Sequence, residues 1–110
     1  MLEFSQVKIE IFIPKDFVPV LREEISKAGA GVIGLYDHCA SVTDVRGYWQ
    51  PMQGANSYDG KIGEISEARE CKVEVNCPRG AVPGVLKAIR AVHPYEEPLI
   101  NIIPLVNDLF

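Results

Sequence analysis

Apolar and polar residues alternate near the start of the chain. One face of this segment carries Val7, Ile9, Ile11 and Ile13, and mostly polar residues stand between them. A period of two predicts a strand with one buried face. Pro14 ends the strand, because proline cannot donate to a sheet ladder.

The apolar spacing then changes to that of a helix. Asp16 is expected to cap the helix N-terminus, and Pro19 falls in the first turn, where a missing N–H costs little. The buried stripe continues at Leu21, Ile25 and Ala28. The glycine-rich segment 29–31 ends the helix where left-handed backbone angles are needed.

The second half of the chain repeats this order. With a shift of 64 residues, the segment from Val7 lies over the segment from Cys71 without a gap. Each half therefore predicts a strand, a corner with a proline, and a helix. The identical pairs are Lys8 with Lys72, Glu10 with Glu74, Pro14 with Pro78, Val18 with Val82, Pro19 with Pro83 and Ile25 with Ile89.

Further elements complete the predicted fold. The segments Ser41–Val45 and Leu99–Val106 favour strands, and Gly54–Ser57 marks a turn between the halves. The order strand, helix, strand, strand, helix, strand predicts an α+β, ferredoxin-like βαββαβ sandwich, with a four-stranded antiparallel sheet and two helices on one face. At 110 residues, positions 1–110 are expected to form a single domain. The second helix is predicted to bury Val82, Leu86, Ile89 and either Val92 or His93.

Composition excludes several classes of function. The chain has 11 basic and 15 acidic residues, a formal net charge of −4, so the basic footprint of a nucleic-acid-binding protein is missing. No apolar run reaches the roughly 18 to 20 residues of a membrane span. We therefore expect a cytoplasmic protein that binds neither nucleic acid nor membrane.

The three cysteines are an odd number without a C-x-x-C pair, which fits a reducing compartment. Cys71 and Cys77 align with Val7 and Ile13 in the repeat, so both are expected in the core. Cys39 follows His38 directly, and a thiol beside an imidazole is either structural or a ligand or nucleophile. We favour the structural interpretation, because neighbours on a strand point to opposite faces.

Polar chemistry is most concentrated in the hexapeptide His93-Pro94-Tyr95-Glu96-Glu97-Pro98. One interpretation is structural: Pro94 ends the helix, and His93, a cation favoured by the helix dipole, is tied to Glu96 or Glu97. The other is a site for a ligand or a metal.

A group of motifs carries a family resemblance. They are Gly31–Cys39 (GVIGLYDHC), Gly54-Ala55-Asn56 with Gly60 and Gly63, and the hexapeptide HPYEEP. Together they resemble the domain inserted in YqfO proteins, bacterial members of the Nif-three-like, or GTP cyclohydrolase type two-like, family. The resemblance implies a fold similar to CutA and PII proteins, which are typically trimeric, and a free-standing version of a domain usually embedded in a larger protein.

The resemblance also limits what is carried over. The larger family members bind two metal ions through residues of the halves that flank the insert, and no residue of this chain matches those ligands. Neither the dinuclear metal site nor a hydrolase activity is therefore implied. A homo-oligomer is implied, with a trimer as the first expectation and a dimer as the second.

The candidate ligand-binding residues are His93, Tyr95, Glu96, Glu97, Tyr36 and Asp37. The candidate ligands for a divalent metal, Zn or Cu(II), are His38, Cys39, His93, Glu96 and Glu97. The loops entering the second and fourth strands lie at opposite ends of such a sheet, so these two groups can meet only across a subunit boundary. Tyr48 and Trp49 form either a binding platform or a contact with a neighbouring subunit, and we favour the contact.

Three functions remain open. The first is a small oligomeric binding or regulatory module for a small ligand, a metal ion or a partner protein. The second is a metal-binding protein or metal-dependent enzyme with an intersubunit site, and the third is a purely structural oligomerisation domain. We favour the first over an enzyme, because no nucleophile, base and orienting group share one predicted face.

Overall fold

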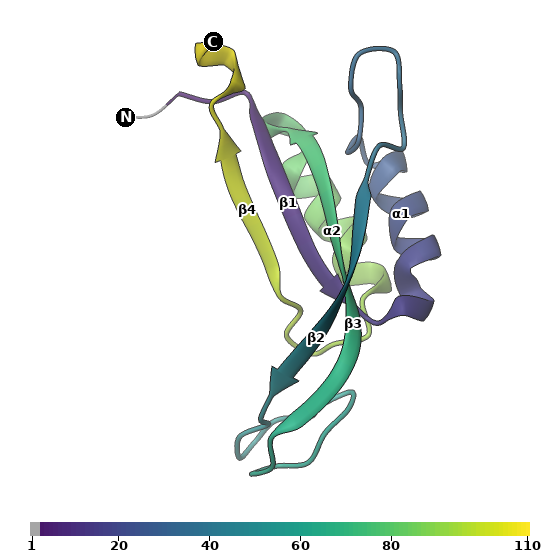
Figure 1. Ribbon diagram of the computed structural model, residues 1–110, viewed down its shortest axis with the longest axis vertical. Coiled ribbons are helices and arrows are strands. Elements are labelled where there is room, and N and C mark those ends of the chain that lie inside the picture. The colour runs from purple at the N-terminus through teal and green to yellow at the C-terminus, as the bar shows by residue number, and fades with distance from the viewer. Residues whose placement is uncertain (1–2) are drawn as a thin grey trace.

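A computed structural model describes residues 3–110 of the chain. Four strands form one antiparallel sheet in the order β2-β3-β1-β4, and two α-helices lie together behind it (Figure 1). The predicted ferredoxin-like α+β sandwich is confirmed. The elements are β1 (Gln6–Ile13), α1 (Val18–Lys27), β2 (Ser41–Trp49), β3 (Ser66–Pro78), α2 (Val82–Val92) and β4 (Ile100–Leu105).

The core lies between the two central strands and the helices. β1, and β3 from Cys71 to Cys77, bury every second side chain, as the alternation predicts, and each helix contributes two fully buried residues. Each buried aliphatic side chain stabilises the fold by about 1.5–3 kcal/mol. On α2 the buried pair is Val85 and Ile89, and Val82, Leu86 and Val92 pack around it partly buried.

The two strand-to-helix corners repeat each other closely. Pro14 and Pro78 each precede a single 3-10 turn, and a proline stands in the first turn of each α-helix. The expectation that Asp16 caps α1 is wrong, since Asp16 lies inside the 3-10 turn Lys15–Phe17 and the N-cap position is Phe17. The N–H of Phe17 donates to the carbonyl of Pro14 over 3.0 Å, so the backbone itself makes the turn.

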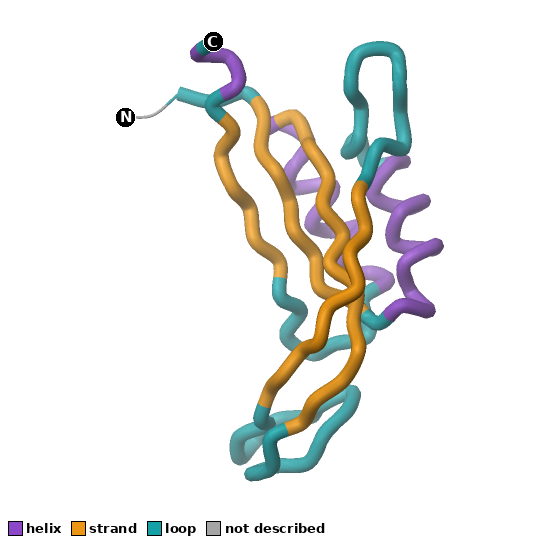
Figure 2. The backbone as a smooth tube through the Cα atoms, in the orientation of Figure 1, coloured by secondary structure: helices purple, strands orange, loops and turns teal. Residues whose placement is uncertain are grey.

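The β2–β3 hairpin extends beyond the rest of the sheet. β1 pairs with β3 only as far as Ile13 opposite Cys71, whereas β2 continues along β3 to Trp49 opposite Ser66. We call residues 45–70 the hairpin arm; Figure 2 shows it projecting past the end of β1. The radius of gyration is 15.2 Å, compared with about 13 Å for a compact domain of this length.

The sequence did not predict the full length of this arm. Residues 66–70 read Ser-Glu-Ala-Arg-Glu, which lacks the apolar alternation that marks a strand with a buried face. They are extended because they pair with β2, and the helices do not cover them. Pairing with β2, and not the burial of an apolar face, therefore explains why residues 66–70 form a strand.

The two loops that carry the sequence motifs lie at opposite ends of the sheet. The loop 28–40 enters β2 at one end, and the loop 93–99 enters β4 at the other end, beside the hairpin arm (Figure 1). This separation was expected from the topology and is confirmed. Cys71 and Cys77 are buried as predicted, while Cys39 is half-buried.

Within residues 3–110, no helix has the length and apolar character needed to cross a membrane.

Truncating the core should destabilise the fold. We expect Ile89→Ala to lower the free energy of unfolding by about 2–5 kcal/mol, because it removes a side chain that is fully buried between α2 and the sheet. Val20→Ala, on the exposed side of α1, should change it by less than about 0.5 kcal/mol. Urea denaturation measures both, and equal losses would contradict the assigned core.

Candidate functional site

The hexapeptide begins with a histidine whose ring is fully engaged. α2 ends at Val92, and His93 takes extended backbone angles before Pro94. The ring Nε2 lies 2.7 Å from the carbonyl oxygen of Phe12 at the end of β1, and Nδ1 accepts from the N–H of Tyr95 at 3.2 Å. These partners fix a neutral ring that carries its proton on Nε2.

This arrangement corrects the predicted role of His93. The imidazole is bound by backbone groups and not by Glu96 or Glu97, and it is not poised as a cation. Burial lowers the pKa of His93, and this effect outweighs the opposing hydrogen bond to Phe12 and the nearby charge of Glu70. The side chain is only 8% exposed, so desolvation disfavours the charged form more than the helix dipole favours it.

Tyr95 ties the same loop to the hairpin arm. Its hydroxyl donates to Oε2 of Glu70 on β3 over 2.9 Å. Burial, followed by the hydrogen bond to Glu70, raises the pKa of Tyr95. The phenol therefore stays protonated, and the bond to a carboxylate contributes about 1.5–3 kcal/mol.

Glu70 is a carboxylate held on the sheet face that points away from the helices. It pairs with Val45, and a side chain at Gly47 would place its Cβ 1.6 Å from Oε1 of Glu70. Because Gly47 has no side chain, there is room for the Glu70 carboxylate. The residue is 8% exposed, although no helix covers this face of β3.

The loop of the hairpin arm folds back over this region. Trp49 donates from Nε1 to the carbonyl of Asp59 over 3.0 Å, and the N–H of Asn56 donates to Oε2 of Glu96 over 2.8 Å. The Tyr95 ring lies with its centroid 6.3 Å from that of Trp49 and 5.8 Å from that of Tyr58. Three aromatic rings from three segments therefore meet at Tyr95.

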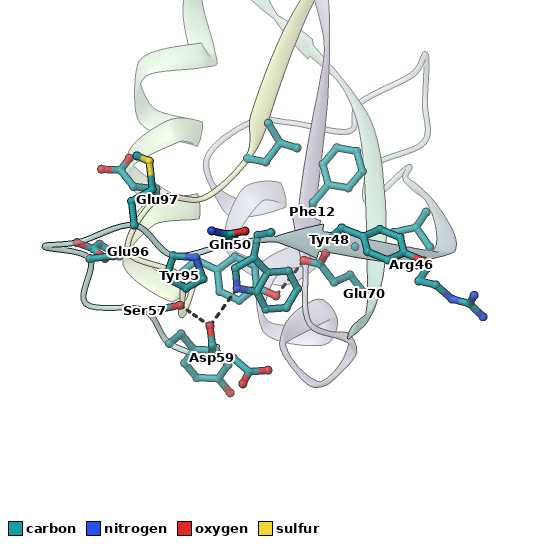
Figure 3. A pocket seen from close by; sticks show the side chains of 18 of the residues that line it. Phe12, Arg46, Tyr48, Gln50, Ser57, Asp59, Glu70, Tyr95, Glu96 and Glu97 are labelled. Atoms are coloured by element: carbon teal, nitrogen blue, oxygen red, sulfur yellow. Dashed lines mark hydrogen bonds between the residues drawn. The ribbon is translucent and has the colours of Figure 1, made fainter. Parts of the chain in front are cut away.

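These segments border an open cavity of about 680 Å³ between the hairpin arm and the hexapeptide (Figure 3). We call it the arm cavity. Its charged lining residues are four acids and one base, namely Glu70, Asp59, Glu96, Glu97 and Arg46. Its large apolar and aromatic lining residues are Phe12, Tyr48, Trp49, Met52, Tyr58, Tyr95 and Leu99. A concave, largely apolar surface with a few polar groups is typical of a small-molecule site.

The structure brings together only part of the predicted site. Tyr95, Glu96 and Glu97 line the arm cavity, while His93 is outside its lining and packs against Tyr95 with ring centroids 4.9 Å apart. Trp49 and Tyr48 also belong to the lining. The predicted residues of loop 28–40 lie at the far end of the sheet and do not contribute.

The far loop is a tight turn with an exposed tip. Ile33 and Tyr36 exchange backbone hydrogen bonds, and the tip exposes Leu35 and Tyr36. His38 has a φ of 58° and lies 2.8 Å from Oδ1 of Asp37. That hydrogen bond raises the pKa of His38.

Within residues 3–110 of a single chain, no group of three or more His, Cys, Asp or Glu side chains is placed to hold a metal ion. The predicted metal ligands were His38 and Cys39 of one subunit with His93, Glu96 and Glu97 of another. Because that site spans two subunits, it stays a prediction. His93 would have to give up one of its two backbone partners to bind an ion.

Sequence reasoning missed several residues of the cavity. Glu70 was not noticed, because a glutamate in a polar segment normally indicates a solvated face. Phe12 stands between buried positions of β1, so the alternation places it on the outward face, but nothing in the pattern showed that it lines a cavity. Tyr58 and Asp59 lie in a long loop whose fold-back has no local signature.

His93 should make stability depend on pH. Its folded pKa is lowered, so the unfolded chain binds a proton first, and the free energy of unfolding should fall as the pH drops below about 6.5, the unfolded value, until the folded pKa is reached. Each unit of lowering corresponds to about 1.4 kcal/mol. Urea denaturation between pH 7.5 and 5.5 measures this loss, and we expect His93→Gln to reduce it.

His38, the other histidine of the chain, is the matched control. Its raised pKa gives the opposite sign: the stabilising contribution is full below about pH 6.5 and is lost as the pH rises through the folded pKa. His38→Gln should therefore steepen the loss seen on acidification. Equal pH profiles for His93→Gln and the unaltered chain would contradict a neutral, buried His93.

Known proteins share both the sequence and the fold, although no family model matches the chain. The protein named GTP cyclohydrolase 1 type 2 homolog from Mycobacterium leprae is 41% identical over 96 residues, covering 87% of this chain and 25% of the relative. The protein of the same name from Bacillus subtilis is 34% identical over 98 residues, covering 89% and 26%. The chain thus spans about a quarter of the length of these relatives.

Solved structures agree with the sequence matches. A Bacillus cereus protein related to NIF3 superposes with a TM-score of 0.83 at 29% identity, covering 97% of this chain and 27% of that one. CutA1 from Shewanella sp. SIB1 superposes with a TM-score of 0.74 at 17% identity, covering 96% and 86%, which shows a shared fold. These comparisons identify the chain as a homologue of a segment, about one quarter of the total length, of the GTP cyclohydrolase 1 type 2 homologues of the YqfO/NIF3 family.

Proposed function

We propose that the chain is a small, homo-oligomeric binding module whose ligand occupies the arm cavity. The observation that carries the proposal is the cavity itself, about 680 Å³ in volume, with aromatic side chains and carboxylates converging from three segments. Its size is within the range of small-molecule sites. The CutA-like fold supports a binding or regulatory role, and any activity of the longer relatives is a separate question.

The hydrogen bonds around the cavity support a preformed site. Tyr95 is fixed through Glu70, Trp49 through Asp59, and the hexapeptide through the bond from Asn56 to Glu96. Side chains fixed before the ligand arrives lose little conformational freedom on binding. A module that only assembled subunits would not need such a cavity, so we place the structural alternative behind the binding module.

The exposed apolar surface supports assembly with further copies. β2 and β4 are the edge strands of the sheet, and β4 with the residues after it exposes Ile102, Ile103, Val106, Leu109 and Phe110. Edge strands and apolar side chains in water favour association. We propose a trimer first and a dimer second, in a cytoplasmic setting that suits three unpaired thiols.

Ligand binding can be tested through the only tryptophan of the chain. The indole N–H of Trp49 gives a single resolved cross-peak in a ¹H–¹⁵N spectrum, and we expect compounds that enter the arm cavity to shift it at millimolar concentration or below. Signals of loop 28–40 should stay in place, since this loop lies at the far end of the sheet. Compounds that shift only other regions, or a diverse fragment set that shifts nothing, would refute the proposal.

Gly47→Ala is the variant for this binding test. The added Cβ would displace the Glu70 carboxylate and break its hydrogen bond with Tyr95. We expect at least tenfold weaker binding. Gly84→Ala is the control: a Cβ there meets open space, and alanine favours the helix α2.

Assembly can be tested by native mass spectrometry. We expect trimers, and we expect Ile103→Lys to shift the population towards monomers, because the change places a charge on the exposed apolar surface of β4. Val20→Lys on α1 is the control and should leave the assembly unchanged. A monomeric unaltered chain at micromolar concentration would contradict the assembly.

A further inference from the structure

The charge of the arm cavity is strongly one-sided. Four of its five charged lining residues are acidic. The basic one, Arg46, pairs with Glu67 over 3.1 Å, which leaves its charge partly neutralised. Carboxylates that line a concave surface attract cations and repel anions. The cavity therefore suits a positively charged ligand far better than a phosphate or a carboxylic acid.

Glu70 supplies a fixed charge in the wall of this cavity. Its Oε2 accepts from Tyr95, whereas Oε1 makes no hydrogen bond within residues 3–110. The residue is more than nine-tenths buried, yet no side-chain oxygen or nitrogen of the described residues is both fully occluded and unsatisfied. Oε1 is therefore not fully occluded, and since Glu70 lines the arm cavity, this oxygen is the acceptor that remains for a donor or a cation.

The aromatic rings define the shape of the ligand. Trp49, Tyr58 and Tyr95 converge with centroid separations of 6.3 and 5.8 Å around Tyr95. Such a group offers π-faces, which attract ammonium and guanidinium groups and bind them best when carboxylates lie nearby. A bare metal ion would instead need three or more converging donor side chains, and residues 3–110 place no such group in one chain.

We propose that the ligand of the arm cavity is an organic cation, an amine or quaternary ammonium compound, held by the rings of Trp49, Tyr58 and Tyr95 and by the carboxylate of Glu70. The proposal rests on the proposed function and names the ligand class for that site. Glu96 takes a structural part through Asn56, while Glu97 and Asp59 add negative charge at the rim. Because His93 is neutral, its ring adds no positive charge beside Tyr95 that would repel a cation.

The test compares ligands of one shape and different charge. Choline, its neutral isostere 3,3-dimethyl-1-butanol, and ATP are titrated into the full chain, and the Trp49 indole cross-peak is followed. We expect choline to bind at least tenfold more tightly than the isostere, and ATP to leave the peak unmoved. Glu70→Gln should weaken choline binding about tenfold and leave the isostere unchanged, since it removes charge and keeps the shape.

Two further variants keep the test independent of folding. Glu97→Gln removes a rim carboxylate that makes no side-chain hydrogen bond within residues 3–110, and it should weaken choline binding two- to threefold. Glu64→Gln removes a carboxylate of the hairpin-arm loop that lies outside the cavity lining, and it should have no effect.

The outcomes separate this inference from the proposed function. Equal affinity for choline and its isostere, or binding of ATP in preference to choline, overturns the cation and leaves a ligand-binding cavity in place. Failure of all three compounds and of the wider fragment set to move the Trp49 peak overturns both.

Discussion

The site depends on a single corner of the chain that is tied to three other segments. After α2, His93 is bonded to the end of β1, Tyr95 to Glu70 on β3, and Glu96 to the loop of the hairpin arm. Because these ties come from residues close together in sequence, they hold one short loop against three parts of the fold. The arm cavity exists because the corner cannot move independently of the arm.

The β2–β3 hairpin extends past the end of β1, and this places the hairpin arm beside the corner. Five residues of β3 extend past the last pairing with β1, so the arm has no helix beneath it. Aromatic rings and a buried carboxylate cover it from the other face instead. Such a surface is more polar than the core, and it is open to ligands in a way that the space under the helices is not.

The hexapeptide illustrates how far local reasoning reaches. Its role as a corner was predicted correctly, because Pro94 and Pro98 restrict the backbone wherever they occur. The partner of His93 was predicted wrongly, because the charged neighbours in sequence were chosen over a backbone carbonyl 81 positions away. Likewise, a binding platform at Trp49 was only the less favoured of two interpretations, and Glu70 was not recognised at all. Residues whose role comes from distant contacts leave no mark in the local pattern.

The sequence by itself determined the strand β1, the strand β3 from Cys71 onward, both helices, their matching corners and the topology of the sheet. Periodicity and proline position act over a few residues, so they can be read without coordinates. Only the tertiary structure decided that Phe12 lines a cavity beside the hairpin arm, that Gly47 makes room for Glu70, and that His93 stays neutral. These features depend on which distant groups meet and how dry their meeting place is, and neither is encoded in local spacing.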